Sequence, residues 1–150
     1  MCFLLIPAVI FSGERPMPPL AVKAAMLVDM NTGRILFQQN SERVIQPASL
    51  SKIMSLYLIA EDIENGKADY TDLVTVSEQA VHTNGSKILF EPGEQCEVLD
   101  LIKGMAIYSS NDAALALAEH FGGSVEKFVR RMNAKAREMG MKHTHFVNPH

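Results

Sequence analysis

Apolar and polar residues come in blocks along the chain, and the first block that predicts structure lies near the N-terminus. Two apolar-rich runs, residues 24–29 and 34–38, flank the turn sequence Asn31-Thr32-Gly33. Two such runs joined by a short turn containing Asn and Gly are typical of a β-hairpin. The pattern therefore predicts two antiparallel strands, which follow a proline-rich linker at residues 14–21.

Beyond the hairpin, apolar positions recur at the spacing of helices. The predicted helices are residues 47–65, 97–108, 113–121 and 124–139. Pro47 suits a first helical turn, Ser124 suits a cap, and the glycines at 66, 122 and 140 suit helix ends. The sequence pattern predicts a short strand at residues 73–77 and a loop at residues 84–94.

This pattern leaves the predicted sheet incomplete. An isolated hairpin is stable only when more strands or a helical layer cover it. The final residues, Asn148-Pro149-His150, fall within an expected strand or loop. We therefore expect further elements of the fold to follow them.

The N-terminal run from Cys2 to Phe11 is apolar throughout and too short to span a membrane. It resembles the core of a secretory signal, although no Lys or Arg precedes it and no clear cleavage site follows. We expect residues 1–19 to be the remainder of a signal peptide and a linker, and residues 20–150 to form part of one domain.

Composition narrows the function classes. A chain of 150 residues with 47% hydrophobic and 21% charged residues has enough material for one core. The net charge of −3 and the scattered basic residues do not favour a nucleic-acid surface. The two cysteines do not form a disulfide framework, and we expect Cys96 to be a half-buried thiol.

The predicted helix that begins near Pro47 carries one charged residue at an unexpected place. At about 100° per residue, four apolar side chains lie within about 80° of Lys52: Leu56, Ile59, Ala60 and Ile63. Lys52 is therefore predicted to lie in the middle of the apolar face, one turn from Ser49. In a second Ser-x-x-Lys sequence, at Ser124, the same count places the lysine, Lys127, toward water.

A buried lysine has a lowered pKa, as a general base near neutral pH requires. Ser49 is one turn away, and a serine hydroxyl becomes a nucleophile when an adjacent base takes its proton. The alternative is that Ser49 or Ser51 caps the helix while Lys52 extends to the surface or pairs with an acid. Helical phase alone leaves both interpretations open.

Four polar residues, Ser109-Ser110-Asn111-Asp112, separate two apolar helical runs. Such residues are also common in turns and caps, so this break has an ordinary structural explanation. A serine–lysine enzyme, however, needs a second proton carrier and an amide that orients the substrate backbone. Ser109 and Asn111 could supply both.

The pairing of Ser49-x-x-Lys52 with Ser109-x-Asn111 resembles the penicillin-recognising serine acyltransferases. The chain is most similar to the penicillin-binding proteins that are D-alanyl-D-alanine carboxypeptidases. The resemblance covers nearly everything from residue 20 onward, including "AAMLVDMNTGRILFQQN", "QPASLSKIM" and "EPGEQCEVLDLIKGMAIYSSNDAALALAEH". The third element of the family, Lys-Thr-Gly on a strand, does not occur in these 150 residues.

The resemblance implies an α+β fold of the β-lactamase/DD-peptidase type, of which this chain is the N-terminal part. It implies that Ser49 is the nucleophile, Lys52 the general base, Ser109 a proton carrier and Asn111 a substrate-binding residue. The implied substrate is a peptidoglycan stem peptide ending in D-Ala-D-Ala, and β-lactams are the implied covalent inhibitors. No cofactor or metal is implied. The expected location is the cell envelope or periplasm, with peripheral membrane association as a further expectation.

Two other functions and a metal site are weighed against this one. A class A β-lactamase would carry a deacylating Glu after the Ser-x-Asn turn, whereas the only acid in residues 138–150 is Glu138, inside a predicted helix. A non-catalytic remnant would explain the missing Lys-Thr-Gly. A metal site at His143, His145 and His150 lacks a nearby acid or cysteine and is disfavoured.

Overall fold

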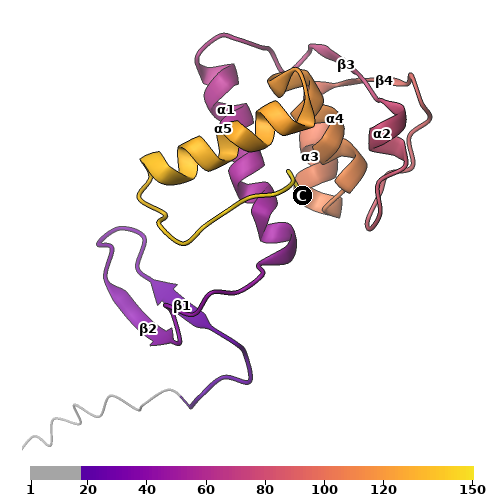
Figure 1. Ribbon diagram of the computed structural model, residues 1–150. Coiled ribbons are helices and arrows are strands. Elements are labelled where there is room, and N and C mark those ends of the chain that lie inside the picture. Colours follow the sequence, from indigo (N-terminus) through magenta and orange to yellow (C-terminus); the bar gives the residue numbers. More distant parts are fainter. Residues whose placement is uncertain (1–17) are drawn as a thin grey trace, which may run out of the picture. The chain divides into compact units, whose positions relative to one another are not determined.

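The computed structural model describes residues 18–150, which form two compact units, one ending at Ile45 and the other running from Gln46 to His150 (Figure 1). Each unit has its own secondary structure. The signal-like run from Cys2 to Phe11 lies outside the described residues.

The first unit contains the predicted hairpin. Strand β1 (Ala25–Val28) pairs with β2 (Ile35–Gln39) in antiparallel register, with Leu27 opposite Phe37. The turn is stabilised by the carboxylate of Asp29, which accepts hydrogen bonds from the backbone N–H and the hydroxyl of Thr32. Gly33 has a positive φ of 69°, which glycine adopts without strain. The hairpin prediction is confirmed.

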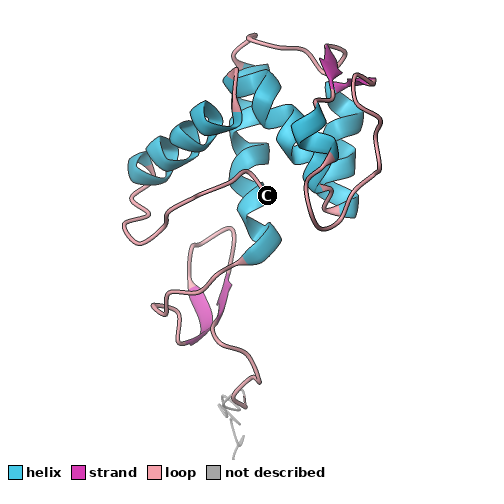
Figure 2. Ribbon diagram, turned by 45° about the vertical axis from the view of Figure 1, so that its right-hand side comes forward, coloured by secondary structure: helices cyan, strands magenta, loops and turns pink. Residues whose placement is uncertain are grey.

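The second unit is mainly helical, and the cyan helices of Figure 2 make up most of it. Its helices are η1 (Ala48–Ser51, a 3₁₀ turn), α1 (Lys52–Glu64), α2 (Glu78–Val81), α3 (Val98–Tyr108), α4 (Asn111–Gly122) and α5 (Val125–Glu138). Helix α4 packs against α1, α2, α3 and α5. Every residue from Asp112 to Ala118 is buried. The many alanines of α4 are small, so the neighbouring helices approach it closely.

A second small sheet joins β3 (Leu73–Thr75) to β4 (Gln95–Glu97) in antiparallel register. The strand expected at residues 73–77 is present, but β4 and the short helix α2 were not predicted. Cys96 is the only apolar residue of β4, so the sequence shows no strand pattern there. Cys96 is half-buried, as expected.

The first predicted helix differs in two respects from the expectation. The α-helix begins at Lys52 rather than Pro47, because Ala48 has a positive φ of 51° and the following residues form the 3₁₀ turn. The buried residues of α1 are Lys52, Met54, Ser55, Leu58, Ile59 and Asp62. These span an arc in which Lys52 lies at one edge, so its predicted position in the middle of the buried face was wrong.

Ion pairs tie α1 to α5. The buried carboxylate of Asp62 pairs with Arg131 and with Lys67, and Lys135 pairs with Glu61. Arg131 also donates a hydrogen bond to the carbonyl oxygen of Phe121 at 2.7 Å, which links the end of α4 to the same cluster. Among residues 18–150, no helix has the length and apolar character needed to cross a bilayer.

Candidate active site

Ser49 and Lys52 meet at the junction of η1 and α1. Side chains three residues apart eclipse each other in a 3₁₀ helix, so this turn aligns Ser49 with Lys52 more closely than an α-helix would. Lys52 Nζ lies 3.1 Å from Ser49 Oγ. Ser49 itself is exposed, whereas Lys52 is only 3% exposed. The hydroxyl is therefore accessible while its neighbouring amine is shielded.

The turn between α3 and α4 supplies two further partners of Lys52. Ser109 Oγ lies 3.3 Å and Asn111 Oδ1 lies 2.7 Å from Lys52 Nζ. Ser109 ends α3 in the left-handed conformation with a φ of 55°, and the chain then turns into α4 at Asn111. The structure thus brings together all four predicted site residues, which lie up to 62 positions apart in the sequence.

Burial lowers the pKa of Lys52 below its ordinary value of 10.5. The three side-chain partners of Lys52 in the structure are two hydroxyls and one amide oxygen, and none of them carries a negative charge. A neutral amine has two N–H donors and one lone pair. It can donate to Ser109 and Asn111 and accept the proton of Ser49, which is the arrangement that a general base requires.

Asn111 is held from a second side by the loop that precedes β4. Its Nδ2 donates to the carbonyl oxygen of Asn84 at 2.6 Å, and its backbone N–H donates to the carbonyl oxygen of Ser86 at 2.7 Å. A carbonyl oxygen only accepts hydrogen bonds, so the Nδ2 atom must face Asn84 and the Oδ1 atom must face Lys52. Neither Asn84 nor Ser86 was predicted to belong to the site.

The C-terminal segment also approaches Lys52. Ser55 Oγ donates to the carbonyl oxygen of Pro149 at 2.7 Å, which fixes residues 148–150 against α1 (Figures 1 and 2). Burial lowers the pKa of His150 below its ordinary value, and the charge of Lys52 lowers it further. The sequence suggests His150 only as part of a disfavoured metal site, because no local pattern links it to a residue 98 positions earlier.

The second Ser-x-x-Lys sequence behaves as predicted. Ser124 caps α5 by accepting a hydrogen bond from the backbone N–H of Lys127 at 3.2 Å, and Lys127 is exposed. The same residue pattern therefore gives a helix cap at one place and a serine–lysine pair at the other. Burial of the lysine distinguishes them.

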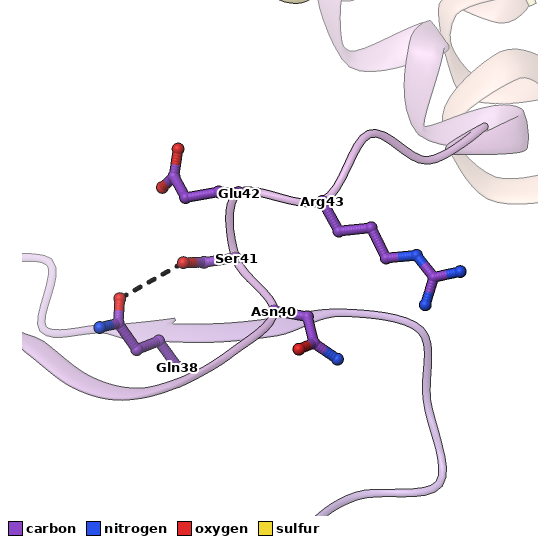
Figure 3. A pocket seen from close by; sticks show the side chains of 5 residues that line it. All are labelled: Gln38, Asn40, Ser41, Glu42 and Arg43. Carbon is purple, nitrogen blue, oxygen red and sulfur yellow. Dashed lines mark hydrogen bonds between the residues drawn. The ribbon is translucent and has the colours of Figure 1, made fainter.

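A hollow of about 500 Å³ lies in the first unit, after β2. Figure 3 shows its lining residues, Gln38, Asn40, Ser41, Glu42 and Arg43. The side chains of Glu42 and Arg43 point away from each other, and four of the five residues are exposed. The one hydrogen bond drawn among them runs from Ser41 Oγ to Gln38 Oε1, at 3.4 Å. Within residues 18–150, no group of three or more potential metal ligands gathers.

The chain is similar in sequence to known proteins of one family. The sequence model of a family described as D-alanyl-D-alanine carboxypeptidase matches residues 12–150. The chain is 46% identical, over 127 residues, to the D-alanyl-D-alanine carboxypeptidase DacF of Bacillus subtilis; the match covers 85% of this chain and 33% of DacF. The chain thus spans about a third of the length of that relative.

Solved structures agree. The D-alanyl-D-alanine carboxypeptidase DacD from Francisella tularensis has a TM-score of 0.85 and 39% identity, covering 88% of this chain and 32% of that protein. Ampicillin-bound penicillin-binding protein D2 from Listeria monocytogenes has a TM-score of 0.73 and 28% identity, covering 90% of this chain and 54% of that protein. The helices and strands described above are therefore part of a penicillin-binding-protein fold.

Proposed function

Because the chain belongs to the D-alanyl-D-alanine carboxypeptidase family, we propose that it carries the nucleophile of a serine-type D-Ala-D-Ala carboxypeptidase acting on peptidoglycan stem peptides. One observation carries the proposal. Ser49 Oγ, Ser109 Oγ and Asn111 Oδ1 all lie within hydrogen-bond distance of Lys52 Nζ, a buried amine whose pKa is lowered.

In the proposed acylation, neutral Lys52 takes the hydroxyl proton of Ser49 as Oγ attacks the carbonyl carbon of the penultimate D-Ala. The C–N bond to the terminal D-Ala then breaks, and Ser109 passes a proton to the departing amine while Lys52 restores the proton of Ser109. Asn111 holds the backbone of the peptide. Water then hydrolyses the ester, which releases the shortened peptide and free Ser49.

The same proposal explains inhibition by β-lactams. Attack of Ser49 Oγ on the carbonyl of a penicillin would open the four-membered ring, and the leaving amine would stay tethered to the acyl group. The ampicillin-bound state of the Listeria protein described above supports this reaction class. Hydrolysis would then be slow because the tethered group blocks the approach of water.

The proposed location follows from the substrate. Peptidoglycan lies outside the cytoplasmic membrane, so the enzyme must be exported, and the apolar run from Cys2 to Phe11 suits a secretory signal. We place the mature protein in the periplasm or cell envelope, with peripheral membrane association as the further proposal.

A class A β-lactamase is the less favoured function. Such an enzyme needs a carboxylate near the acyl-enzyme to activate water. Glu138, the only acid in residues 138–150, is exposed at the end of α5 and pairs with Lys135 at 3.0 Å. It is therefore already used in a surface ion pair.

The test of the proposed nucleophile is labelling of the full-length protein with fluorescent penicillin. The wild-type protein should be labelled covalently and Ser49→Ala should not, because the alanine has no attacking oxygen. Ser124→Ala is the matched control, since Ser124 starts the other Ser-x-x-Lys sequence and should leave labelling unchanged. Labelling that persists in Ser49→Ala would show that another residue is the nucleophile.

Release of free D-Ala from a stem pentapeptide, followed by mass spectrometry, tests the carboxypeptidase activity separately. The wild-type protein should shorten the peptide by one residue and Ser49→Ala should not. A protein that is labelled by penicillin but leaves the pentapeptide intact would retain the nucleophile and lose the proposed substrate.

A further inference from the structure

We infer that Asp112 is a positioning residue for acylation: its buried carboxylate holds residues 84–89 against the start of α4, and this loop sets the orientation of the Asn111 amide toward Lys52. The inference rests on the function proposed above. It assigns a role to two parts of the molecule that the proposed mechanism does not use, namely Asp112 and the loop before β4.

Asp112 is fully buried, at 0% exposure. One face of its carboxylate accepts hydrogen bonds from the backbone N–H groups of Ile88 and Leu89, each 3.1 Å from Oδ2. Oδ1 accepts from the backbone N–H of Ala113 at 2.8 Å and from the hydroxyl of Ser110. A single carboxylate thus joins the loop to the first turn of α4.

Burial alone would raise the pKa of Asp112, but these hydrogen bonds outweigh it and hold the pKa below its ordinary value of 3.8. The carboxylate is therefore ionised at neutral pH. An ionised carboxylate only accepts hydrogen bonds, which matches the four donors around it. An asparagine of the same size would turn its NH₂ group toward two of these donors.

The loop held by Asp112 reaches Asn111 through Asn84 and Ser86, whose carbonyl oxygens accept from Asn111 Nδ2 and from its backbone N–H. Gly85 permits this close approach. It has a φ of +92°, and a Cβ atom there would lie 2.6 Å from Asn111 Nδ2. Contacts of that length essentially never occur, so a side chain at residue 85 would displace the amide.

Orientation of the amide decides whether Lys52 can act as a base. With Oδ1 toward Lys52, the amide accepts an N–H and leaves the lone pair of the amine free for the proton of Ser49. With the amide turned over, Nδ2 would donate to that lone pair and block it. The Asn84 carbonyl prevents the turned state, because it would then face Oδ1, another acceptor.

The experiment measures the second-order rate constant for acylation of the full-length protein by penicillin, as a function of pH. Asp112→Asn should lower the rate constant about 10–100-fold, because displaced catalytic geometry has effects of this size. Asp100→Asn is the matched control, since Asp100 is an exposed residue of α3 that pairs with Lys103, and it should acylate as the wild type does. Rates are divided by the fraction of protein that is labelled at long times.

The pH profile separates positioning from loss of folded protein. Asn111 Oδ1 stabilises the ammonium form of Lys52, so losing it should lower the pKa of Lys52 and move the acid limb of the profile to lower pH. The titratable group that bears on Lys52 is His150, from the C-terminal segment; burial, and then the charge of Lys52, lower its pKa, which favours the neutral imidazole. A substitution that only destabilised the folded protein would reduce the fraction of protein that is labelled, and the acid limb of the pH profile would stay at the pH of the wild type.

Gly85→Ala provides a second variant, in the exposed part of the loop, that leaves the buried carboxylate untouched. It should show the same slower acylation and the same shift of the acid limb. The inference would be overturned if Gly85→Ala, or folded Asp112→Asn, had the rate constant for acylation and the acid limb of the wild type. A wild-type protein that penicillin does not label would instead overturn the proposed function.

Discussion

Lys52 and Lys135 show how residues of one type acquire opposite properties. Lys135 lies between Glu61 and Glu138, and these carboxylates raise its pKa. Lys52 is buried among hydroxyl and amide oxygens, and burial lowers its pKa. Because none of its three side-chain partners in the described residues is a carboxylate, Lys52 is able to lose its proton closer to neutral pH. A lysine with these partners is suited to proton transfer.

Replacing Lys52 with arginine tests this role at the scale of one residue. A guanidinium stays protonated throughout the accessible pH range, so Lys52→Arg should keep the positive charge and lose the base. We expect the rate constant for acylation by penicillin to fall by roughly 10²–10⁴-fold, the usual contribution of general base catalysis. Rapid-mixing kinetics with fluorescent penicillin measure it.

The control for this substitution is Lys127→Arg, in the second Ser-x-x-Lys sequence, which should acylate at the wild-type rate. Circular dichroism should show that both variants keep their helices. If Lys52→Arg acylates within threefold of the wild type, another group must take the proton of Ser49.

At the scale of elements, Asp62 determines how α1 is attached to its neighbours. Its side chain is 4% exposed and pairs with Arg131 of α5 and with Lys67, which follows α1. Burial raises the pKa of Asp62, but the hydrogen bonds and charges of these two cations more than compensate and hold the pKa below 3.8. These two ion pairs therefore hold the C-terminal end of α1, whereas Lys52 lies at its N-terminal end.

Arg131→Met should lower the free energy of unfolding by about 2–4 kcal/mol, because it leaves a buried carboxylate with one exposed partner. Urea titration at pH 7 measures this loss. Arg130→Met is the matched control: Arg130 is the neighbouring exposed residue of α5, and its removal should change stability by less than about 0.5 kcal/mol. Equal losses in the two variants would contradict the role of the ion pair.

The same measurement has a predictable pH dependence. Asp62 and Asp112 both have pKa values below the ordinary 3.8 in the folded state, so unfolding favours proton uptake. Their contribution to stability is fully present above that value and is lost as the pH falls through and below about 4. Stability of the wild type should therefore fall as the pH drops below about 4.

At the scale of the whole molecule, the hairpin unit contains little buried apolar surface of its own. Apolar side chains on both of its faces are exposed: Met26, Leu27, Val28, Ile35 and Leu36. A hairpin alone is marginally stable, and exposed apolar surface of this kind is normally covered by other strands or helices. The matches cover only 33% of DacF and 32% of the Francisella carboxypeptidase.

We therefore predict that the 150-residue chain, expressed by itself, acylates at least about 10²-fold more slowly than the full-length protein. Lys-Thr-Gly is absent from residues 1–150, and the family resemblance implies that the strand carrying it supplies one oxyanion-hole N–H. Loss of one such donor lowers rate constants by about 10²–10³-fold. Penicillin labelling of the two proteins at equal concentration measures the difference. Equal rates would show that residues 1–150 contain every group needed for acylation.

The sequence by itself determined the hairpin, the four longer helices, the strand near residue 73 and the residue types of the candidate site. The turn at Asn31-Thr32-Gly33 indicated the hairpin, helical spacing indicated the four longer helices, and a lysine among apolar positions drew attention to Ser49 and Lys52. These features depend on neighbours within one or two turns, which periodicity and turn chemistry record. Strand β4 was missed because its three residues carry no such pattern.

Only the tertiary structure decided how the site is assembled. The contacts of Lys52 with Asn111, of Asp112 with Ile88 and of Ser55 with Pro149 join residues that are 59, 24 and 94 positions apart. Such contacts depend on how buried helices pack and on which polar groups find partners, and a local pattern contains neither. For the same reason, only the packed helices show which side of α1 is buried and that Lys52 lies at the edge of that side.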